Sequence, residues 1–393
     1  MNRIYLDYAA TTPLDPAVSK TIRDFELKYL GNPSSVHREG QQARAEIDFA
    51  RAAIAKFLNA KPQEIIFTSG ATEANNHAIK GVVSRALFDW GMRPHIITTE
   101  LEHHSVYNVV KEMEKRGVVE ATFIKPSSDG LISADQVIKE IKNNTVLISV
   151  IFVSNEIGSV LPIREIGKQL SSINSHLSTN RKVFFHVDAV QAAKFYNLNV
   201  EKLGCDLMTI TAHKLYGPKG VGALYMRTGL KIDNLMSGGA QEYAMRPGTQ
   251  NTAGIIGFAK AVKLLGGLEE REALGKKIGE LRNQLRNSIE SIPGVEMNGP
   301  MGDCRSPDNL SVTVRDIDQD SLITALDLAG IAASTGSACV SGSSEPSHVI
   351  QALGKITDSQ SATVRFTLGK FTTEKEIKQI LKIFPEIVNR LRK

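Results

Sequence analysis

Short apolar runs alternate with stretches of helical periodicity between about residue 60 and residue 226. The runs that predict strands are Glu64–Thr68, His95–Thr98, Val146–Val153, Val183–Asp188, Asp206–Thr211 and Gly222–Met226. Apolar residues between these runs recur every three or four positions, as at Ala78, Val82 and Ala86 and over Ile163–Leu170, which predicts amphipathic helices. Strands joined by helical crossovers indicate an α/β fold with a mostly parallel sheet.

The pattern changes after about residue 258. Apolar residues from Leu274 to Ile292 keep a spacing of three or four among charged residues, which predicts one long amphipathic helix. A strand near Asn309–Val314 and helices near Leu322–Leu328 and Glu374–Leu391 are predicted to follow. This second pattern indicates a smaller α+β unit.

The chain has 393 residues, more than one hydrophobic core usually serves. We therefore expect a large domain over residues 15–258 and a small domain built from residues 1–14 and 259–393. The formal net charge of +5 is spread along the chain without a basic stripe, so we expect no direct nucleic-acid binding. The most apolar run, Val146–Val153, is too short to span a bilayer.

The three cysteines, Cys205, Cys304 and Cys339, make an odd count and lack the spacing of metal ligands. We expect no metal site and a reduced, cytoplasmic setting. The first residues, MNRIYLDYAATTP, contain no apolar core of a secretory signal, which agrees with that setting.

Reactive side chains follow the ends of two predicted strands. Lys214 comes after Asp206–Thr211 and beside His213, where its amine could form a Schiff base with an aldehyde cofactor, usually pyridoxal phosphate. Asp188 ends an apolar strand, and a protonated pyridine nitrogen of the same cofactor would offset the cost of burying its carboxylate. The simpler alternatives are a solvated lysine and a helix N-cap aspartate.

The cofactor phosphate would also need an anion site. Ser69, Gly70, Ala71 and Thr72 connect a predicted strand to a predicted helix, and backbone amides at a helix N-terminus bind anions. An ordinary glycine turn with a helix cap is the alternative at this position.

Three more side chains could contact the cofactor or its substrate. His103 follows a strand and could stack on the cofactor ring, and the Asn155 amide could bond a ring substituent. Arg365 lies in the strand-like run VRFTLG and could hold a substrate carboxylate with two parallel hydrogen bonds. Taken singly, each is as easily a structural or exposed residue.

The stretch Ser334–Ser344 (STGSACVSGSS) differs from the rest because its small residues cannot pack a core. It predicts a flexible loop with Cys339 in its middle. That thiol is either an inert surface cysteine or a nucleophile that must move to reach its targets.

Eight motifs resemble those of cysteine desulfurases of the NifS and IscS type, over essentially the whole chain. They are YLDYAATTP at Tyr5–Pro13, GNPSS at Gly31–Ser35, FTSGATEANN at Phe67–Asn76, EHHSV at Glu102–Val106, NEIG at Asn155–Gly158, HVDAVQ at His186–Gln191, AHKLYGPKG at Ala212–Gly220, and STGSACVSG at Ser334–Gly342. The resemblance implies the α/β architecture of fold-type I pyridoxal-phosphate transferases and a homodimer. It also implies transfer of sulfur from L-cysteine to an enzyme cysteine with release of L-alanine.

By this resemblance Lys214 is the Schiff-base lysine, His103 an acid or base, and Cys339 the sulfur acceptor. The implied cofactor contacts are Ala71, Thr72, His103, Asn155, Asp188, Gln191, Thr211, His213, Lys214 and Thr249, the last reaching the other subunit's phosphate. Substrate would be held by Asn32, Asn155 and Arg365. The Cys339 persulfide would pass its sulfur to an acceptor protein, either an iron–sulfur scaffold or a tRNA-thiolating enzyme.

The sequence departs from the family pattern at Ser154, at Tyr243 with the three residues after it, and at Ser361. None of these removes an implied cofactor contact. A selenocysteine lyase or another class-V aminotransferase would keep Lys214 and Asp188, but an aminotransferase has no need of Cys339. A non-catalytic partner protein of a sulfur pathway is a further alternative, which the intact set of cofactor residues opposes.

Overall fold

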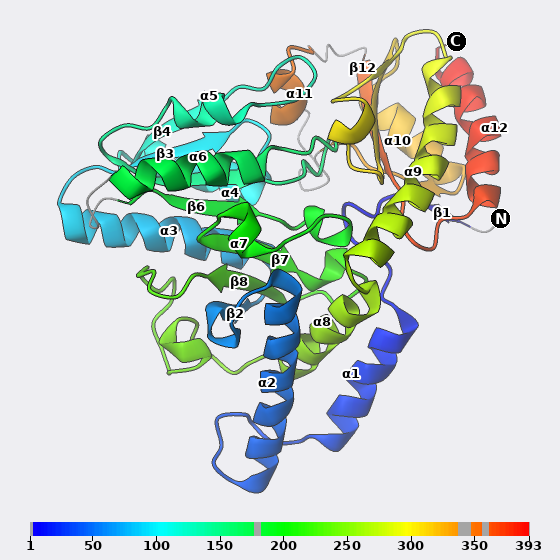
Figure 1. The fold of residues 1–393 in the computed structure, drawn as a ribbon. Coiled ribbons are helices and arrows are strands. Elements are labelled where there is room, and N and C mark those ends of the chain that lie inside the picture. Colours follow the sequence, from blue (N-terminus) through cyan, green and yellow to red (C-terminus); the bar gives the residue numbers. More distant parts are fainter. Residues whose placement is uncertain (1–2, 177–181, 337–346, 356–360, 393) are drawn as a thin grey trace.

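The computed structural model describes residues 3–176, 182–336, 347–355 and 361–392, and its centre is a seven-stranded sheet (Figure 1). The order across this sheet is β2-β8-β7-β6-β5-β3-β4. The strands are β2 (Ile65–Thr68), β3 (His95–Thr99), β4 (Glu120–Ile124), β5 (Thr145–Ile151), β6 (Phe184–Asp188), β7 (Leu207–Thr211) and β8 (Gly222–Met226). Neighbours from β7 to β4 pair in parallel, whereas β8 is antiparallel to both β7 and β2. The mostly parallel α/β sheet predicted from the sequence is confirmed.

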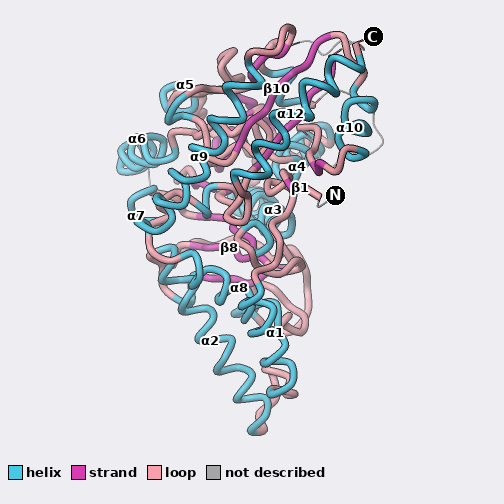
Figure 2. Tube along the Cα trace, turned by 90° about the vertical axis from the view of Figure 1, so that its right-hand side faces the viewer, coloured by secondary structure: helices cyan, strands magenta, loops and turns pink. Residues whose placement is uncertain are grey.

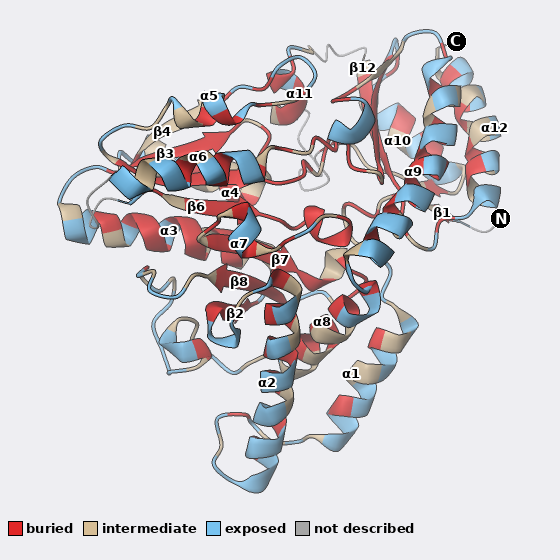
Figure 3. Ribbon diagram, viewed as in Figure 1, coloured by how far each residue is buried: buried red, intermediate tan, exposed pale blue. Residues whose placement is uncertain are grey.

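Helices cover both faces of this sheet because alternate strand residues point to opposite sides. Ile97 belongs to a hydrophobic cluster with residues of α2 and α6, while its neighbour Ile96 packs with residues of α3 and α4. The helices of this part are α1 (Pro16–Lys28), α2 (Arg38–Leu58), α3 (Ala71–Trp90), α4 (His104–Lys115), α5 (Ala134–Ile138), α6 (Ile163–His176), α7 (Val200–Leu203) and α8 (Thr252–Leu265). Figure 3 shows the strands buried between these layers.

Helices α1 and α2 were not predicted from the sequence. Both pack against α8, and they extend away from the sheet in Figures 1 and 2. Strand β4 at the sheet edge also escaped prediction, since its burial is only partial and its apolar pattern is weak. The strand predicted over Val146–Val153 is β5, which ends two residues earlier at Ile151.

A separate hydrophobic cluster joins the first residues of the chain to its last third. Its elements are β1 (Ile4–Tyr5), α9 (Leu268–Glu290), β9 (Val295–Met297), β10 (Asn309–Arg315), α10 (Gln319–Leu328), β11 (Ile331–Ala332), β12 (Ser361–Thr367) and α12 (Glu374–Leu391). Helix α11 (His348–Ala352) packs instead in the cluster that contains Ile97, through Val349 and Ile350. Strands β12, β10 and β9 form an antiparallel sheet, and β1 pairs in parallel with β11. The predicted long helix is α9, and it begins six residues before Leu274.

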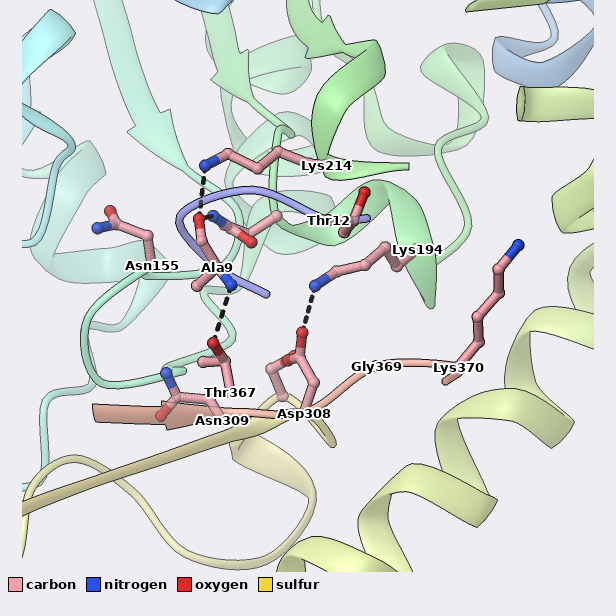
Figure 4. A network of polar contacts seen from close by, with 12 residues as sticks. Ala9, Thr12, Asn155, Lys194, Lys214, Asp308, Asn309, Thr367, Gly369 and Lys370 are labelled. Carbon is pink, nitrogen blue, oxygen red and sulfur yellow. Dashed lines mark hydrogen bonds and ion pairs between the residues drawn. The ribbon is translucent and has the colours of Figure 1, made fainter. Parts of the chain in front are cut away.

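The buried pair Lys194–Asp308 connects the two clusters, since Lys194 follows β6 and Asp308 precedes β10 (Figure 4). An ion pair this deeply buried holds its two elements in one register, because separating the charges would leave both uncompensated. No helix in the described ranges combines the length and apolarity needed to cross a membrane.

Candidate active site

A cavity of about 560 Å³ opens where β5, β6 and β7 end. Parallel strands present their carboxyl ends at one edge of a sheet, where α/β folds bind ligands. The predicted site residues in its lining are Ala71, Thr72, His103, Asn155, Asp188, Gln191, Thr211, His213, Lys214 and Arg365. The fold therefore brings together residues that the sequence scatters over almost 300 positions.

Lys214 ends a single 3₁₀ turn, Ala212–Lys214, that follows β7 directly. Its Nζ donates hydrogen bonds of 2.5 Å to the carbonyl oxygens of Ala9 and Ala10, which line the same cavity (Figure 4). Thr12 holds this N-terminal segment in place, because its backbone N–H donates to the carbonyl of His213 over 2.9 Å. The amine is therefore fixed at the cavity wall by polar groups that a ligand can replace.

Asp188 is the last residue of β6, and its side chain is 3 % exposed. One carboxylate oxygen accepts from Asn75 Nδ2 at 2.8 Å, and the other from the Val190 backbone N–H at 3.1 Å. Burial raises the pKa of Asp188 above its ordinary value, and hydrogen bonds and Lys214 only partly oppose that effect. A buried carboxylate that has neutral hydrogen-bond partners is suited to pair with a cationic ligand atom.

His103 caps the N-terminus of α4. Its Nδ1 accepts the Ser105 backbone N–H at 3.1 Å, so the ring proton lies on Nε2. Burial lowers the pKa of His103 to about 4, and the nearby Lys214 ammonium adds to this shift. The imidazole is therefore neutral near pH 7 and carries an N–H donor on Nε2.

The predicted phosphate turn begins α3 at Ala71 and borders the cavity. A Cβ on Gly222 would lie 2.8 Å from the Gly70 carbonyl carbon, so glycine is required where β8 passes this turn. Thr72 is exposed to solvent, and the amides of the first turn carry the positive end of a 20-residue helix. This end of the cavity can bind an anion.

Two more of the expected phosphate contacts, Thr211 and His213, line the same cavity. Thr211 is buried, and its hydroxyl donates to the Val221 carbonyl over 2.9 Å. His213 Nδ1 lies 3.3 Å from Thr11 Oγ1, and burial followed by the charge of Lys214 lowers its pKa to about 4. Both side chains are thus oriented at the cavity wall by the protein itself.

Arg365 is 1 % exposed and comes from the middle of β12. Its Nη1 donates to the carbonyls of Asn155 (2.8 Å) and Gly336 (3.1 Å), and its Nη2 pairs with Asp7 at 3.0 Å. The guanidinium lines the cavity, and these hydrogen bonds fix its position there. Gln191 is likewise bonded, from Nε2 to the Ala9 carbonyl over 3.0 Å.

Two of the expected site residues that the structure describes are not in the lining of this cavity. Asn32 and Thr249 are exposed and lie outside its lining. Cys339 lies outside the described residues. The segment that contains Thr249 is tied to the phosphate turn, because Arg246 pairs with Glu73 at 2.8 Å and Glu73 accepts the Ser69 N–H.

The structure also contains contacts that sequence reasoning missed. Asn75, Ser105 and Asp7 orient Asp188, His103 and Arg365 respectively. Asn75 and Asp7 lie inside motifs that carried the family resemblance, and that membership was the available signal. Ser154, where the sequence departs from the family pattern, makes a hydrogen bond of its own: its hydroxyl accepts the Glu156 N–H at 3.4 Å.

Residues 4–380 match the family model described as aminotransferase class-V. The chain therefore belongs to this family. Proteins of this family use pyridoxal 5′-phosphate, in agreement with the expected cofactor. A protein named cysteine desulfurase IscS from Dictyoglomus turgidum is 42% identical over 390 residues, covering 99% of this chain and 95% of its own. One of the same name from Clostridium botulinum is 39% identical, covering 100% of this chain and 96% of its own.

Solved structures show the same fold. A NifS-like protein superposes with a TM-score of 0.89 at 32% identity, covering 99% of this chain and 100% of its own. A structure described as SspA in complex with cysteine superposes with a TM-score of 0.78 at 33% identity, covering 94% of this chain and 100% of its own. The resemblance to the NifS and IscS type and the fold-type I architecture are confirmed.

The side chains and the helix N-terminus at this cavity have the chemistry that pyridoxal phosphate needs. Lys214 offers an amine at the cavity wall, Asp188 a buried carboxylate that accepts from the neutral amides of Asn75 and Val190, and α3 an N-terminus for the phosphate. These three groups meet the demands of an aldehyde, a pyridinium nitrogen and a phosphate in one ligand.

Proposed function

We propose that this protein is a cysteine desulfurase that takes sulfur from L-cysteine, releases L-alanine and carries the sulfur as a persulfide on Cys339. The observation that supports this most strongly is the convergence of Lys214, Asp188 and His103 on one cavity that Arg365 also lines. When bound, pyridoxal phosphate supplies an electron sink for the carbon that carries the substrate amine.

The residues expected to bind the cofactor each have a part in this proposal. Lys214 binds the cofactor aldehyde, and the Asp188 carboxylate holds the proton of the pyridine nitrogen in place. His103 would stack on the ring and act as the acid or base through Nε2, since Nδ1 is occupied by the Ser105 N–H. Asn155 and Gln191, which line the cavity, would contact the ring substituents.

The phosphate is bound by Ala71 and Thr72 at the start of α3, together with Thr211 and His213. Arg365 holds the substrate carboxylate, and Asn32 assists it. The proposal places the reacting atoms between the strand ends and the N-terminal segment.

Sulfur transfer needs no outside oxidant or reductant. The Cys339 thiolate attacks the sulfur of bound L-cysteine, so a sulfur–sulfur bond forms while the carbon–sulfur bond breaks. The released electron pair and a proton stay with the carbon fragment, which leaves as L-alanine. A thiolate is the required nucleophile, so the Cys339 thiol must first lose its proton to a base, which His103 can be once its Nε2 proton has been passed on.

The described residues on both sides of segment 337–346 support a role for Cys339. The Gly336 carbonyl accepts from Arg365, and the Ser347 hydroxyl donates to Glu156, so both ends meet residues that line the cavity. Cys339 follows Gly336 by three positions, which an extended chain covers in about 11 Å. An aminotransferase would have no use for a thiol at this place in the sequence.

Further parts of the proposal concern assembly and setting. We propose a homodimer in which Thr249 completes the other subunit's phosphate site, since Thr249 is exposed and outside its own cavity. We also propose a division into residues 15–258 and residues 1–14 with 259–393. The second hydrophobic cluster supports it, because most of its members come from the chain's first six residues and its last third, although α11 packs in the first cluster. The sulfur acceptor is proposed to be an iron–sulfur scaffold or a tRNA-thiolating enzyme, in the cytoplasm.

A direct experiment compares purified holoenzyme with its Cys339→Ser variant on L-cysteine and on L-selenocysteine, with alanine measured by chromatography. The proposal expects alanine from L-cysteine with the parent protein and at least a ~10²-fold slower release with the variant. Equal rates in the two proteins would reject Cys339 as the acceptor and favour a lyase reaction.

A further inference from the structure

Three side chains with metal-binding atoms converge beside the cavity from distant parts of the chain. His104 begins α4, Glu156 follows β5, and His348 begins α11. One ligand atom of each lies within 4.8 Å of the others, and His104 and Glu156 line the cavity. None of these three side chains has a part in the chemistry proposed above.

His104 has buried polar atoms that need partners. Both its ring nitrogens are buried, and neither has a hydrogen-bond partner in the described part of the chain. A neutral imidazole has one donor and one acceptor, and leaving such a group unpaired in the interior costs about 1–3 kcal/mol. His103 next to it, by contrast, is oriented by Ser105. The site around His104 therefore calls for a further polar ligand.

His348 is held in the orientation that metal-binding histidines adopt. Its Nε2–H donates to the Glu102 carbonyl at 3.0 Å, which leaves the lone pair on Nδ1. That Nδ1 is buried and has no partner within the described ranges. Stacking on Tyr107, with ring centroids 4.2 Å apart, fixes the ring plane further. A backbone carbonyl on the distal nitrogen is the usual second contact of a metal-bound histidine.

Glu156 contributes the negative charge. It is 2 % exposed, and its Oε2 accepts a hydrogen bond from Ser347. No lysine, arginine or histidine of the described residues forms an ion pair with it. Arg365 is near enough to act on Glu156 electrostatically but pairs with Asp7 instead. A buried carboxylate without an ion-pair partner is favourable for a bound cation.

We propose that His104, Glu156 and His348 bind one divalent transition-metal ion, with Zn²⁺ as the best match. Two imidazole nitrogens and a carboxylate oxygen are a common zinc ligand set, and they leave a fourth position for water. Ligand atoms around tetrahedral zinc lie roughly 3.3–3.5 Å apart, given bonds of about 2.0–2.2 Å. The ligand atoms would have to approach one another by up to about 1.5 Å, which small rotations about the side-chain torsions can supply.

The sequence expectation of no metal site rested on the cysteines, which indeed take no part here. The ligands come from three segments of the chain, so no spacing pattern could reveal them. The proposal goes beyond desulfurase activity and does not depend on it.

The test measures zinc binding by the holoenzyme after Cys304 and Cys339, whose thiols could themselves bind zinc, have been replaced by serine. In a Cys304→Ser, Cys339→Ser background, equilibrium dialysis against Zn²⁺ followed by elemental analysis should give about one ion per chain. His348→Gln and Glu156→Gln, made separately, should each weaken binding at least about 10-fold. The matched control His176→Gln removes an exposed histidine and should change nothing. Retained visible absorbance of the cofactor confirms that each variant is folded.

X-ray absorption at the zinc edge gives a second readout, where two imidazoles and no sulfur should surround the ion. Zinc that binds equally well to the parent and to both variants would overturn the proposal. So would a parent protein that retains no zinc at micromolar free Zn²⁺, or a first shell that contains sulfur.

Discussion

Arg365 Nη2 lies 3.0 Å from Asp7 Oδ1, which joins the middle of β12 to the segment after β1. The two residues are 358 positions apart in the sequence. The arginine proposed to hold the substrate carboxylate is thus already paired with a protein carboxylate. A substrate must therefore displace Asp7 from Arg365 or share the guanidinium with it.

The first prediction follows from this competition. Arg365→Lys loses the planar fork and should raise the KM for L-cysteine about 10- to 100-fold, with cofactor absorbance retained. Asp7→Asn removes the competing charge and should lower the KM a few-fold, the scale of a weak ion pair. Steady-state kinetics on both variants decides. Equal increases in KM would show that Asp7 supports substrate binding.

The second prediction concerns Lys214. Lys214→Ala should lose turnover and the visible absorbance of the lysine-bound cofactor, because no other amine replaces it at the end of β7. Some cofactor should remain bound through the start of α3. Absorbance spectra and phosphate analysis of the purified variant measure the two effects separately. Alanine release at the parent rate would refute the role given to this lysine.

The third prediction uses the buried Glu102 carboxyl group. Its Oε1 accepts from the Thr99 hydroxyl and the Ile151 N–H, and burial raises its pKa to about 8. The folded protein therefore keeps a proton that the unfolded chain releases above about pH 4.5. The unfolded state binds fewer protons over this window, so this group makes stability fall as pH rises toward 8.

Glu102→Gln keeps the acceptor oxygen and cannot ionise. Its stability relative to the parent should improve between pH 5 and pH 8, with a slope of at most about 1.4 kcal/mol per pH unit. Denaturant unfolding of both proteins at several pH values measures this difference. A difference that does not change with pH would contradict the raised pKa.

A fourth prediction tests the proposed dimer. If Thr249 completes the partner's phosphate site, dilution that separates the subunits should also release cofactor. Light scattering and cofactor absorbance, recorded on the same dilution series, should change together. A monomer that holds one cofactor per chain would be the contrary result.

Much of the fold and part of the site could be predicted because both depend on local patterns. Lys214 and Asp188 follow buried strands, and parallel strands bring such ends to one edge of a sheet. The Asp7–Arg365 pair and the His104–Glu156–His348 cluster could not be predicted, since each depends on how the last third of the chain packs on the first. Thr249 and Asn32 lie outside the cavity of their own chain, so their expected roles stay predictions.

The measurement that tests the central claim most directly is the intact mass of the protein after one turnover with L-cysteine labelled at sulfur. The account predicts that the parent chain gains one labelled sulfur atom on the peptide that contains Cys339, in step with alanine release. The Cys339→Ser variant should still bind cofactor and substrate but gain no sulfur. Labelled sulfur on Cys304 or Cys205 instead, or alanine released at the parent rate by the variant without any protein-bound sulfur, would contradict the account.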